Sequence, residues 1–593
     1  MGGVSLLALC LAVYLPGLWS IPTIDRDEAR FAQASRQMFE SVALPGSERD
    51  TAPILRSDAG ELRGGAHAGG LVVPMVQDRP RLKKPPLIYW LQAGSAYALS
   101  GGDPGRDAIW MYRVPSVIGA IIACLATWRL GLLLVDARAA WLGAALLGVC
   151  PMVVWDAHQA RADQLLLACT TLAMWALTRI WTTREREQRE ISAWGPALGL
   201  WAAVGVGVLT KGPITPMVVA LSALGVSVIS GRWRWLLRLK PVVGVVVVGV
   251  MVLPWVVAVG QRVGWETLRA VAIDETVGRS AAPKEGHWGP PGYHLVLSAV
   301  LLWPGSMLTL VGFVRTCRLA VRLPEVEGGR LAGLRQLPAR WRARVAGRDA
   351  EALLLAWVAP SWVVFELIST KLPHYTLPLY PALALISAAA VVDAARGAMD
   401  SDSFAKLRLG LRIWGVIGVL LCLGLPLGVS MLGGGWIAIG TALLGGGAGA
   451  VLVWRSVAAF DHDYVLRAQL TGVLASVVFA WVFLQVTLPR ARALWITQRL
   501  VGAIERAGLR DAPIANAGYH EDSLIFATRG RAQRIEQGAI PAWVRRHPGG
   551  VLIAPEGTGV DLLPMGWVTL EKVGGFNYAA GRVERLEVLG RER

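Results

Sequence analysis

The sequence predicts a polytopic α-helical membrane protein with about thirteen spans and a small α/β domain after them. Of the 593 residues, 54% are hydrophobic and only 17% are charged, and the mean hydropathy is +0.47. Soluble domains carry about 25% charged residues. Apolar runs of about 17 to 25 residues recur along the chain, and this is the length that a helix needs to cross a bilayer. Together these observations exclude a soluble enzyme and a disordered chain.

The apolar runs give the expected spans in chain order. They are residues 4–19, 114–134, 138–155, 164–181, 194–210, 213–230, 241–260, 293–314, 351–369, 376–393, 411–432, 434–454 and 467–488. An odd number of spans places the two ends of the chain on opposite sides of the membrane.

The basic residues indicate which loops face the cytoplasm. They cluster at 184–189, 232–240, 315–348 and 396–412, and short loops rich in Lys and Arg stay on the cytoplasmic side. The amino terminus is then also cytoplasmic. The formal charge of +17 is explained by this topology, so we expect no nucleic-acid partner. The outer face receives the loops at 20–113, 156–163, 261–292 and 369–375, and the tail from 489.

The tail is less apolar than the rest of the chain. Segments 513–518, 550–555 and 567–573 are typical of strands, and 496–507 is typical of a helix. The sequence therefore predicts two units, a transmembrane unit over 1–488 and an extracytoplasmic α/β domain over 489–593.

A first polar cluster, Asp25-Arg26-Asp27-Glu28, opens the long outer loop. The residues after it have helical periodicity, which predicts an amphipathic helix along the outer surface. Asp25 as helix cap, with Glu28 three residues later, has the pattern of a capping box. Asp27 has no capping role in that interpretation, so it is the better candidate for a general base.

A second cluster runs from Arg81 to Trp90 and contains Lys83-Lys84-Pro85-Pro86. Proline at a first helical position predicts a helix with Lys84 at its positive end, where a phosphate would be held well. The alternative is a pair of lysines that anchor the chain to lipid headgroups.

Other polar residues fall on the same predicted outer face. Each alone is typical of an interfacial anchor, and only their convergence favours a site. They are Asp163, Lys211, Arg279, His287, Lys371, His374 and Tyr375.

In this order the motifs resemble those of one family. They are Arg26–Ala32 (Arg-Asp-Glu-Ala-Arg-Phe-Ala), Lys84–Trp90 (Lys-Pro-Pro-Leu-Ile-Tyr-Trp), Arg161–Asp163 (Arg-Ala-Asp), Lys211–Pro213 (Lys-Gly-Pro), His287–Pro290 (His-Trp-Gly-Pro) and Lys371–Tyr375 (Lys-Leu-Pro-His-Tyr). The chain resembles the aminoarabinose transferase and protein mannosyltransferase superfamily of GT-C type membrane glycosyltransferases over residues 1 to 395.

The resemblance implies an inverting glycosyltransferase. It would move a sugar from a polyprenyl (undecaprenyl) phosphate carrier to a cell-envelope acceptor such as lipid A, another glycan or a protein, on the periplasmic face of the bacterial inner membrane. The leaving phosphate needs cations rather than a strong acid, whereas the acceptor hydroxyl needs a base.

The resemblance also assigns expected roles to individual residues. Lys84, Arg279 and Tyr375 fall on carrier-phosphate positions, Asp27 on the proposed base and Asp163 on a second carboxylate. Glu28 is a further catalytic candidate. Lys83, Lys211, His287, Lys371 and His374 are weaker substrate-binding candidates.

Two features depart from the family pattern. The aminoarabinose transferases have an acid implicated in metal binding directly before the Lys-Pro-Pro lysine, and this chain has Lys83 there. A cation would be repelled by Lys83 and Lys84, so the metal is not carried over from the family, and a divalent metal stays open as an alternative at a position where the usual acidic ligand is Lys83. The glycine-rich stretch 44–80 is the second departure, and we expect a mobile loop that gates the acceptor.

One alternative function remains open, a transporter or flippase of lipid-linked sugars. It also needs a cationic phosphate site, but it predicts functional groups on both faces of the membrane. The sequence identifies neither the sugar nor the acceptor, and we expect a monomer.

Overall fold

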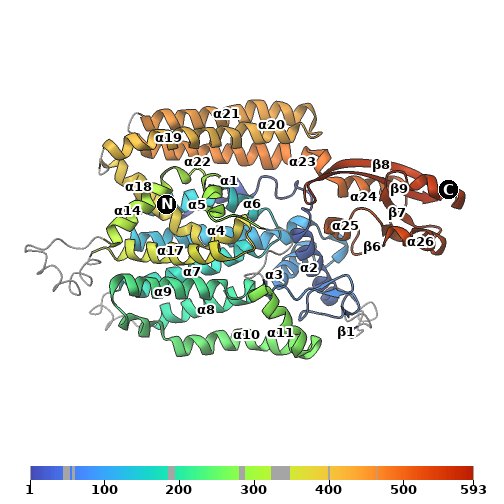
Figure 1. Cartoon of the computed structure of the whole chain (residues 1–593), viewed down its shortest axis with the longest axis horizontal. Helices are drawn as coiled ribbons and strands as arrows, with labels where there is room; N and C mark the ends of the chain where they lie inside the picture. Colours follow the sequence, from blue (N-terminus) through green and yellow to red (C-terminus); the bar gives the residue numbers. More distant parts are fainter. Residues whose placement is uncertain are drawn as a thin grey trace, which may run out of the picture.

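The computed structural model describes residues 2–44, 54–56, 61–183, 194–278, 288–321, 347–397, 401–461 and 464–591. Helices run side by side along the long axis of the molecule, and α2, α3 and a sheet lie together at one end of this bundle (Figure 1). The bundle helices are α1 (Gly2–Tyr14), α4 (Ile109–Leu134), α5 (Ala137–Val149), α6 (Pro151–Ala157), α7 (Asp163–Thr182), α8 (Trp194–Lys211), α9 (Ile214–Ser230), α10 (Pro241–Val263), α14 (Ser306–Val321), α17 (Asp349–Leu367), α18 (Tyr380–Ala395), α19 (Ser401–Val419), α20 (Leu425–Ser430), α21 (Gly435–Asp461) and α22 (Val465–Ala480).

The structure supports a multi-pass membrane protein but does not confirm thirteen spans. Within the described ranges, eight helical stretches are long and apolar enough to cross a bilayer, and the pair α5 and α6, bent by 55°, would be a ninth. The eight coincide with predicted runs. They are Ile109–Leu134, Asp163–Thr182, Arg234–Val263, Asp349–Leu367, Pro373–Ala395, Gly410–Ser430, Gly435–Phe460 and Val465–Arg490.

The remaining predicted spans are shorter or broken. α1 has 13 residues and α9 has 17, against about 20 for a full crossing. The predicted run 293–314 is divided into α13 (Tyr293–Leu301) and α14. The intervening turn contains Leu302 and Trp303, which are buried, so hydropathy alone carries no sign of this break.

The outer loop folds around α2 (Asp27–Ala43) and α3 (Leu87–Ser100), which pack against each other. Phe31 stacks on Tyr89 with ring centroids 5.3 Å apart, and the Ser35 hydroxyl donates to Gln92 at 2.7 Å. Most of α2 is buried on every side, whereas the sequence predicted a helix lying on the surface. Its polar residues are satisfied by protein partners instead of water, which periodicity alone does not reveal.

The starts of α2 and α3 differ from the prediction in their N-cap residues. The N-cap of α2 is Arg26, with a φ of 62°, and Asp25 makes no capping hydrogen bond. Asp25 is buried, and its backbone N–H donates to the Tyr578 hydroxyl at 2.9 Å. Burial raises the pKa of Asp25 to about 7, with Glu521 nearby adding to the effect. The cap of α3 is Pro86, so this helix begins three residues after Lys84.

The described part of the stretch 44–80 is held in place. It forms two antiparallel hairpins, β1 (Leu55–Arg56) with β2 (Leu62–Arg63) and β3 (Met75–Val76) with β4 (Arg79–Pro80). The Gln37 amide donates to the carbonyls of Ala66 and Gln77 at 2.6 and 2.9 Å. The expected gating motion therefore has no support from residues 66–77, whereas 45–53 and 57–60 lie outside the described residues.

The C-terminal part is built on a five-stranded sheet of order β6-β5-β7-β9-β8. β5 is parallel to β6 and β7, and β9 is antiparallel to β7 and β8. The predicted strands and helix are present, and β6 and β9 were not predicted. The elements are α24 (Ile496–Arg506), β5 (Ile514–Asn516), α25 (Asp522–Ala527), β6 (Ala532–Arg534), α26 (Ile540–Arg546), β7 (Val551–Pro555), α27 (Thr558–Leu562), β8 (Trp567–Asn577) and β9 (Arg582–Arg591).

This domain is docked on the outer loop through contacts that Arg36 and Asp107 make with Phe526 and Arg529. Arg36 of α2 pairs with Asp107 at 2.6 Å, lies over the Phe526 ring at 3.7 Å and donates to the Phe526 carbonyl. Arg529 also pairs with Asp107, at 2.6 Å. Removing one partner of a buried pair typically costs roughly 3–5 kcal/mol, so these contacts fix the sheet against α2.

Candidate functional site

Asp27 is the first residue of α2, and its carboxylate lies between two arginines. Oδ1 is 3.7 Å from Arg81 and Oδ2 is 3.8 Å from Arg161, and 48% of the side chain is exposed. Partial burial would raise the pKa of Asp27, but Arg161 and Arg81 outweigh it and lower the pKa to about 2. Asp27 is therefore an accessible, ionised carboxylate whose two cationic neighbours are not in direct hydrogen-bonding contact with it.

Arg161 connects Asp27 to a buried polar cluster behind it. Its guanidinium is 3.3 Å from Asp163, 3.6 Å from Asp156 and 3.1 Å from His374 Nε2. Asp163 also pairs with Lys211, which approaches from the end of α8. Residues from three separate predicted motifs thus meet around one arginine.

Tyr375 lies at the edge of the same cluster. Its ring packs edge-on against His374, with centroids 5.2 Å apart, and the Lys211 ammonium lies over the ring at 5.8 Å. Both contacts depend on the turn Pro373–Leu379 that precedes α18. The structure therefore brings Asp27, Asp163, Lys211, His374 and Tyr375 together through Arg161.

Lys84 occupies a neighbouring position. Its Nζ is 3.0 Å from the Glu275 carboxylate, which belongs to the helical turn Asp274–Gly278 after α11 (Trp265–Ile273). Arg81 donates to the Tyr89 hydroxyl at 3.1 Å. Burial raises the pKa of Tyr89, Arg81 opposes the change, and both Asp27 and Glu275 add to it. Arg81, three residues before Lys84, is itself 3.7 Å from Asp27, so the segment that carries Lys84 borders the Asp27 site.

Lys371 is turned toward a different segment. Its ammonium donates to the carbonyls of Gly289 and Pro290, both at 3.1 Å, and pairs with Glu366 at 3.3 Å. These contacts hold the end of the 261–292 loop against α17. Arg279 and His287 lie in that loop but outside the described residues.

Glu28 is enclosed in a structural network. Its carboxylate forms a two-bond ion pair with Arg113, at 2.8 and 2.9 Å, and accepts from the backbone N–H groups of Ile24 and Ala160. Both side chains are 0% exposed, and Arg113 also donates to the carbonyls of Leu18, Ile21 and Pro22. With no open face, Glu28 is suited to holding the start of the outer loop, and not to contacting a substrate.

We therefore expect Glu28→Gln to destabilise the protein. Breaking one side of a buried ion pair costs roughly 3–5 kcal/mol, because the partner charge stays buried without compensation. Thermal unfolding of the detergent-purified chain, followed by tryptophan fluorescence, measures this effect. Asp27→Asn on the same helix is the matched control and should melt like the parent. An unchanged melting temperature for Glu28→Gln would contradict the structural role.

The nearest charged neighbours of Asp27 are arginines, which do not bind metal ions. Within the described ranges, no group of three or more His, Cys, Asp and Glu side chains is placed to hold an ion. Lys83, at the position of the family's acid, is exposed and lies near Arg81 on the wall of an outer cleft. The Lys83 ammonium is positively charged and has no lone pair to offer, so it cannot replace that acid as a ligand of a metal ion.

Two arginines of the site were not among the predicted site residues. Arg161 and Arg81 are the two cations nearest Asp27, and both stand in the sequence clusters that drew attention to Asp163 and Lys84. The sequence did contain a signal for them, because each arginine stands within three residues of a predicted site residue. Asp156 gave none, because it lies at the end of an apolar run.

The fold is similar to that of a membrane protein of known structure. The chain superposes on the crystal structure of ArnT from Cupriavidus metallidurans bound to undecaprenyl phosphate with a TM-score of 0.67 and 18% sequence identity. The match covers 99% of this chain and 97% of that one. At this identity the likeness establishes the architecture, including the C-terminal sheet.

The sequence similarities are to aminoarabinose and mannosyl transferases. Residues 83–257 match the family model described as dolichyl-phosphate-mannose-protein mannosyltransferase. Two relatives are named undecaprenyl phosphate-alpha-4-amino-4-deoxy-L-arabinose arabinosyl transferase. The one from Yersinia enterocolitica is 25% identical over 443 residues, 73% of this chain. The one from Pectobacterium carotovorum is 26% identical over 401 residues, 67% of this chain.

These matches confirm that the chain is aminoarabinose transferase-like, as its motifs predicted. The alignments span 66% and 59% of the two relatives' own lengths. Nothing in these similarities supports the alternative of a transporter.

Proposed function

We propose that the chain transfers a sugar from a polyprenyl phosphate carrier to an acceptor hydroxyl at the periplasmic face of the bacterial inner membrane. The observation that carries this proposal is the accessible Asp27 carboxylate between Arg81 and Arg161. Lys84 follows Arg81 by three residues, and Tyr375 packs on His374, which contacts Arg161. The names of the relatives, and the undecaprenyl phosphate bound to the solved ArnT, support the class of donor.

The chemistry assigned to Asp27 is proton removal. The acceptor oxygen forms a bond to the anomeric carbon as the bond from that carbon to the phosphate oxygen breaks, and the hydroxyl proton passes to Asp27. Its pKa of about 2 makes Asp27 a weak base before substrate binds. An anionic phosphate that draws on Arg81 and Arg161 would weaken their hold on Asp27 and raise its pKa toward neutrality. Inversion at the sugar carbon follows from a single displacement.

We assign the carrier phosphate to the cations beside this carboxylate. The phosphate would replace Glu275 on Lys84, because both are oxyanions and the ammonium is already positioned for one. Lys211 and Tyr375 would face the departing charge from the other side. Asp163 acts as a positioning residue in this proposal, since it orients both Lys211 and Arg161.

Mass spectrometry of envelope lipids and glycans tests the proposal directly. A strain that expresses the parent chain should contain a species heavier by one sugar residue, and a strain that expresses Asp27→Asn should lack it. Identical profiles, with both proteins present in the membrane at equal levels, would contradict a transferase. The mass increment would also identify the sugar.

A further inference from the structure

Asp25 lies where the outer loop meets the C-terminal domain. It is 9% exposed, and its backbone N–H donates at 2.9 Å to the hydroxyl of Tyr578, which follows β8. The Ser523 hydroxyl of α25 is hydrogen-bonded to the Asp25 carboxyl group. Both partners belong to the C-terminal domain, so undocking of the domain would expose Asp25 to water.

The environment of the Asp25 carboxyl group does not suit a negative charge. Its Oδ1 atom is buried and has no hydrogen-bond partner among the described residues. The charged side chains of the domain that act on it most strongly are two acids, Glu521 and Asp522. Arg26, the next residue in the chain, is exposed to solvent. The ionised form of Asp25 is therefore unfavourable in the docked molecule, because it loses hydration and is repelled by like charges.

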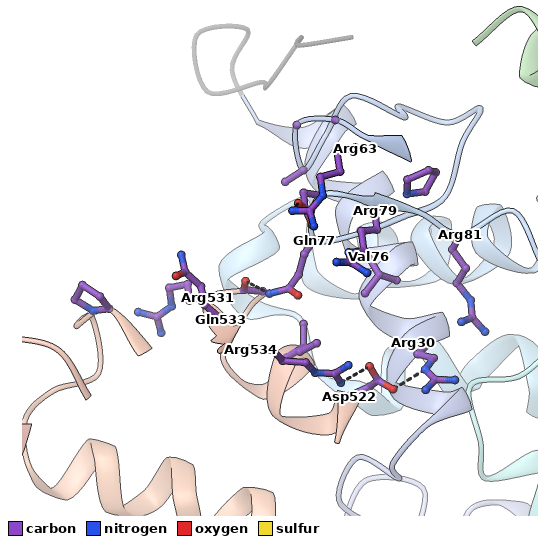
Figure 2. Close-up of a pocket in the computed structure, with 18 of the residues that line it drawn as sticks. Arg30, Arg63, Val76, Gln77, Arg79, Arg81, Asp522, Arg531, Gln533 and Arg534 are labelled. Atoms are coloured by element: carbon purple, nitrogen blue, oxygen red, sulfur yellow. Dashed lines mark hydrogen bonds and ion pairs between the residues drawn. The ribbon is translucent and has the colours of Figure 1, made fainter. Parts of the chain in front are cut away.

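The charged groups around Asp25 have partners of their own. Asp522 pairs with Arg30 of α2 at 2.5 Å and with Arg534 of β6 at 2.9 Å (Figure 2). Glu521 is buried and accepts from the Asn577 amide at 3.0 Å. The remaining charged residues of the outer-loop segment and of β9 are also paired, namely Glu28 with Arg113, Asp27 with Arg81 and Arg161, and Arg582 with Glu584.

The protonation of Asp25 is consequently linked to docking. Burial raises the pKa of Asp25 from 3.8 to about 7, the Ser523 hydroxyl opposes the change, and Glu521 adds to it. In the undocked molecule the carboxyl group is hydrated, and its pKa returns to the ordinary value of about 4. Between these two values the docked molecule holds a proton that the undocked molecule has lost. Docking therefore weakens as pH rises through this range, by up to about tenfold per pH unit, and the loss is complete above the docked pKa.

We propose that Asp25 is a pH-sensitive docking switch, with which the C-terminal domain is held firmly while the carboxyl group keeps its proton and is loosened when the proton leaves to solvent. The switch concerns docking alone and is independent of the proposed transfer reaction. On the predicted outer face it would respond to the pH outside the cytoplasm.

Hydrogen–deuterium exchange of the full chain in nanodiscs tests the switch, because the Asp25 amide loses its Tyr578 partner when the domain leaves. Mass spectrometry of peptides that contain Asp25, and of peptides from 519–528, gives protection factors that are corrected for the effect of pH on intrinsic exchange. In the parent chain we expect these factors to fall by up to about tenfold per pH unit between about pH 5 and pH 7 and to level off above. In Asp25→Asn they should stay high at every pH, because the amide is never charged.

His520→Gln is the matched control, because His520 is an exposed residue beside Glu521 and imidazole side chains titrate near neutral pH. This variant should keep the pH dependence of the parent. Glu521→Gln is a second variant, which keeps the test valid if Asp25→Asn fails to fold. It removes one acid that faces Asp25, so the fall in protection should be smaller and should end at lower pH. Protection in the parent that does not change from about pH 5 to about pH 8 would overturn the switch, and so would the full pH dependence in Asp25→Asn.

Discussion

Asp27→Asn is expected to lower the rate of sugar transfer by roughly 10²- to 10⁴-fold, the usual contribution of a positioned general base. Asparagine keeps the size of the side chain and can still accept from Arg81 and Arg161, but it cannot take a proton. The fold and carrier binding should be unaffected, because the carboxylate is 3.7 and 3.8 Å from its arginines and 48% exposed. Release of polyprenyl phosphate from a sugar-loaded carrier measures the rate.

The matched control for this prediction is Asp25→Asn. Asp25 is two residues away, and burial raises its pKa to about 7, so a neutral amide resembles a form that it already adopts. Transfer by this variant should stay close to that of the parent. Full activity in Asp27→Asn would remove the base from the mechanism, and equal losses in both variants would show that the substitutions act through the fold.

The pH profile provides a second readout of the same carboxylate. The pKa of free Asp27 is about 2, so kcat/KM should show no fall on acidification until well below pH 4. The profile of kcat reports the substrate complex, in which a bound phosphate competes for Arg81 and Arg161. Its acidic limb should therefore lie at higher pH than that of kcat/KM. Coincident limbs would mean that the donor phosphate does not approach these arginines.

The sequence predicted the parts of this molecule that depend on local pattern. The long helices coincide with apolar runs because bilayer thickness sets their length, and the motif residues meet because loops on one side of a membrane share one surface. The break at Leu302 to Gly305 was missed because the prediction used hydropathy, to which the apolar Leu302 and Trp303 add, and not the Pro304-Gly305 dipeptide that marks a turn. The roles of Asp27, Lys84, Asp163 and Tyr375 stay predictions until variants are measured.

The sequence analysis did not predict ion pairs between residues that lie far apart in the chain. Glu28 had the spacing of a capping residue, yet its partner is Arg113, 85 positions later in the chain. Arg30 of α2 pairs with Asp522, 492 positions later in the chain, and no local pattern relates the two residues. Such contacts depend on how the C-terminal domain docks, which is set by contacts such as the ion pair of Arg529 with Asp107.

Lys84→Ala is expected to weaken binding of undecaprenyl phosphate by roughly 2–4 kcal/mol, or about 30- to 1,000-fold, if Lys84 contacts the phosphate where little water competes. The Lys84 side chain is 19% exposed and its ammonium is 3.0 Å from Glu275. Titration of the purified chain with a fluorescent polyprenyl phosphate measures the affinity. Lys572→Ala, a change at an exposed lysine of β8 that pairs with Glu556, controls for the loss of a positive charge.

Glu275→Gln separates a phosphate site from an ordinary salt bridge. If the carrier phosphate displaces the Glu275 carboxylate, neutralising Glu275 removes a competing anion, and affinity should stay equal or rise while Lys84→Ala lowers it. If the pair only braces the turn after α11, both substitutions disturb the same contact and both should lower affinity together. Opposite effects from the two halves of one ion pair cannot come from a loss of structure, whereas parallel losses would withdraw Lys84 from the carrier-phosphate site.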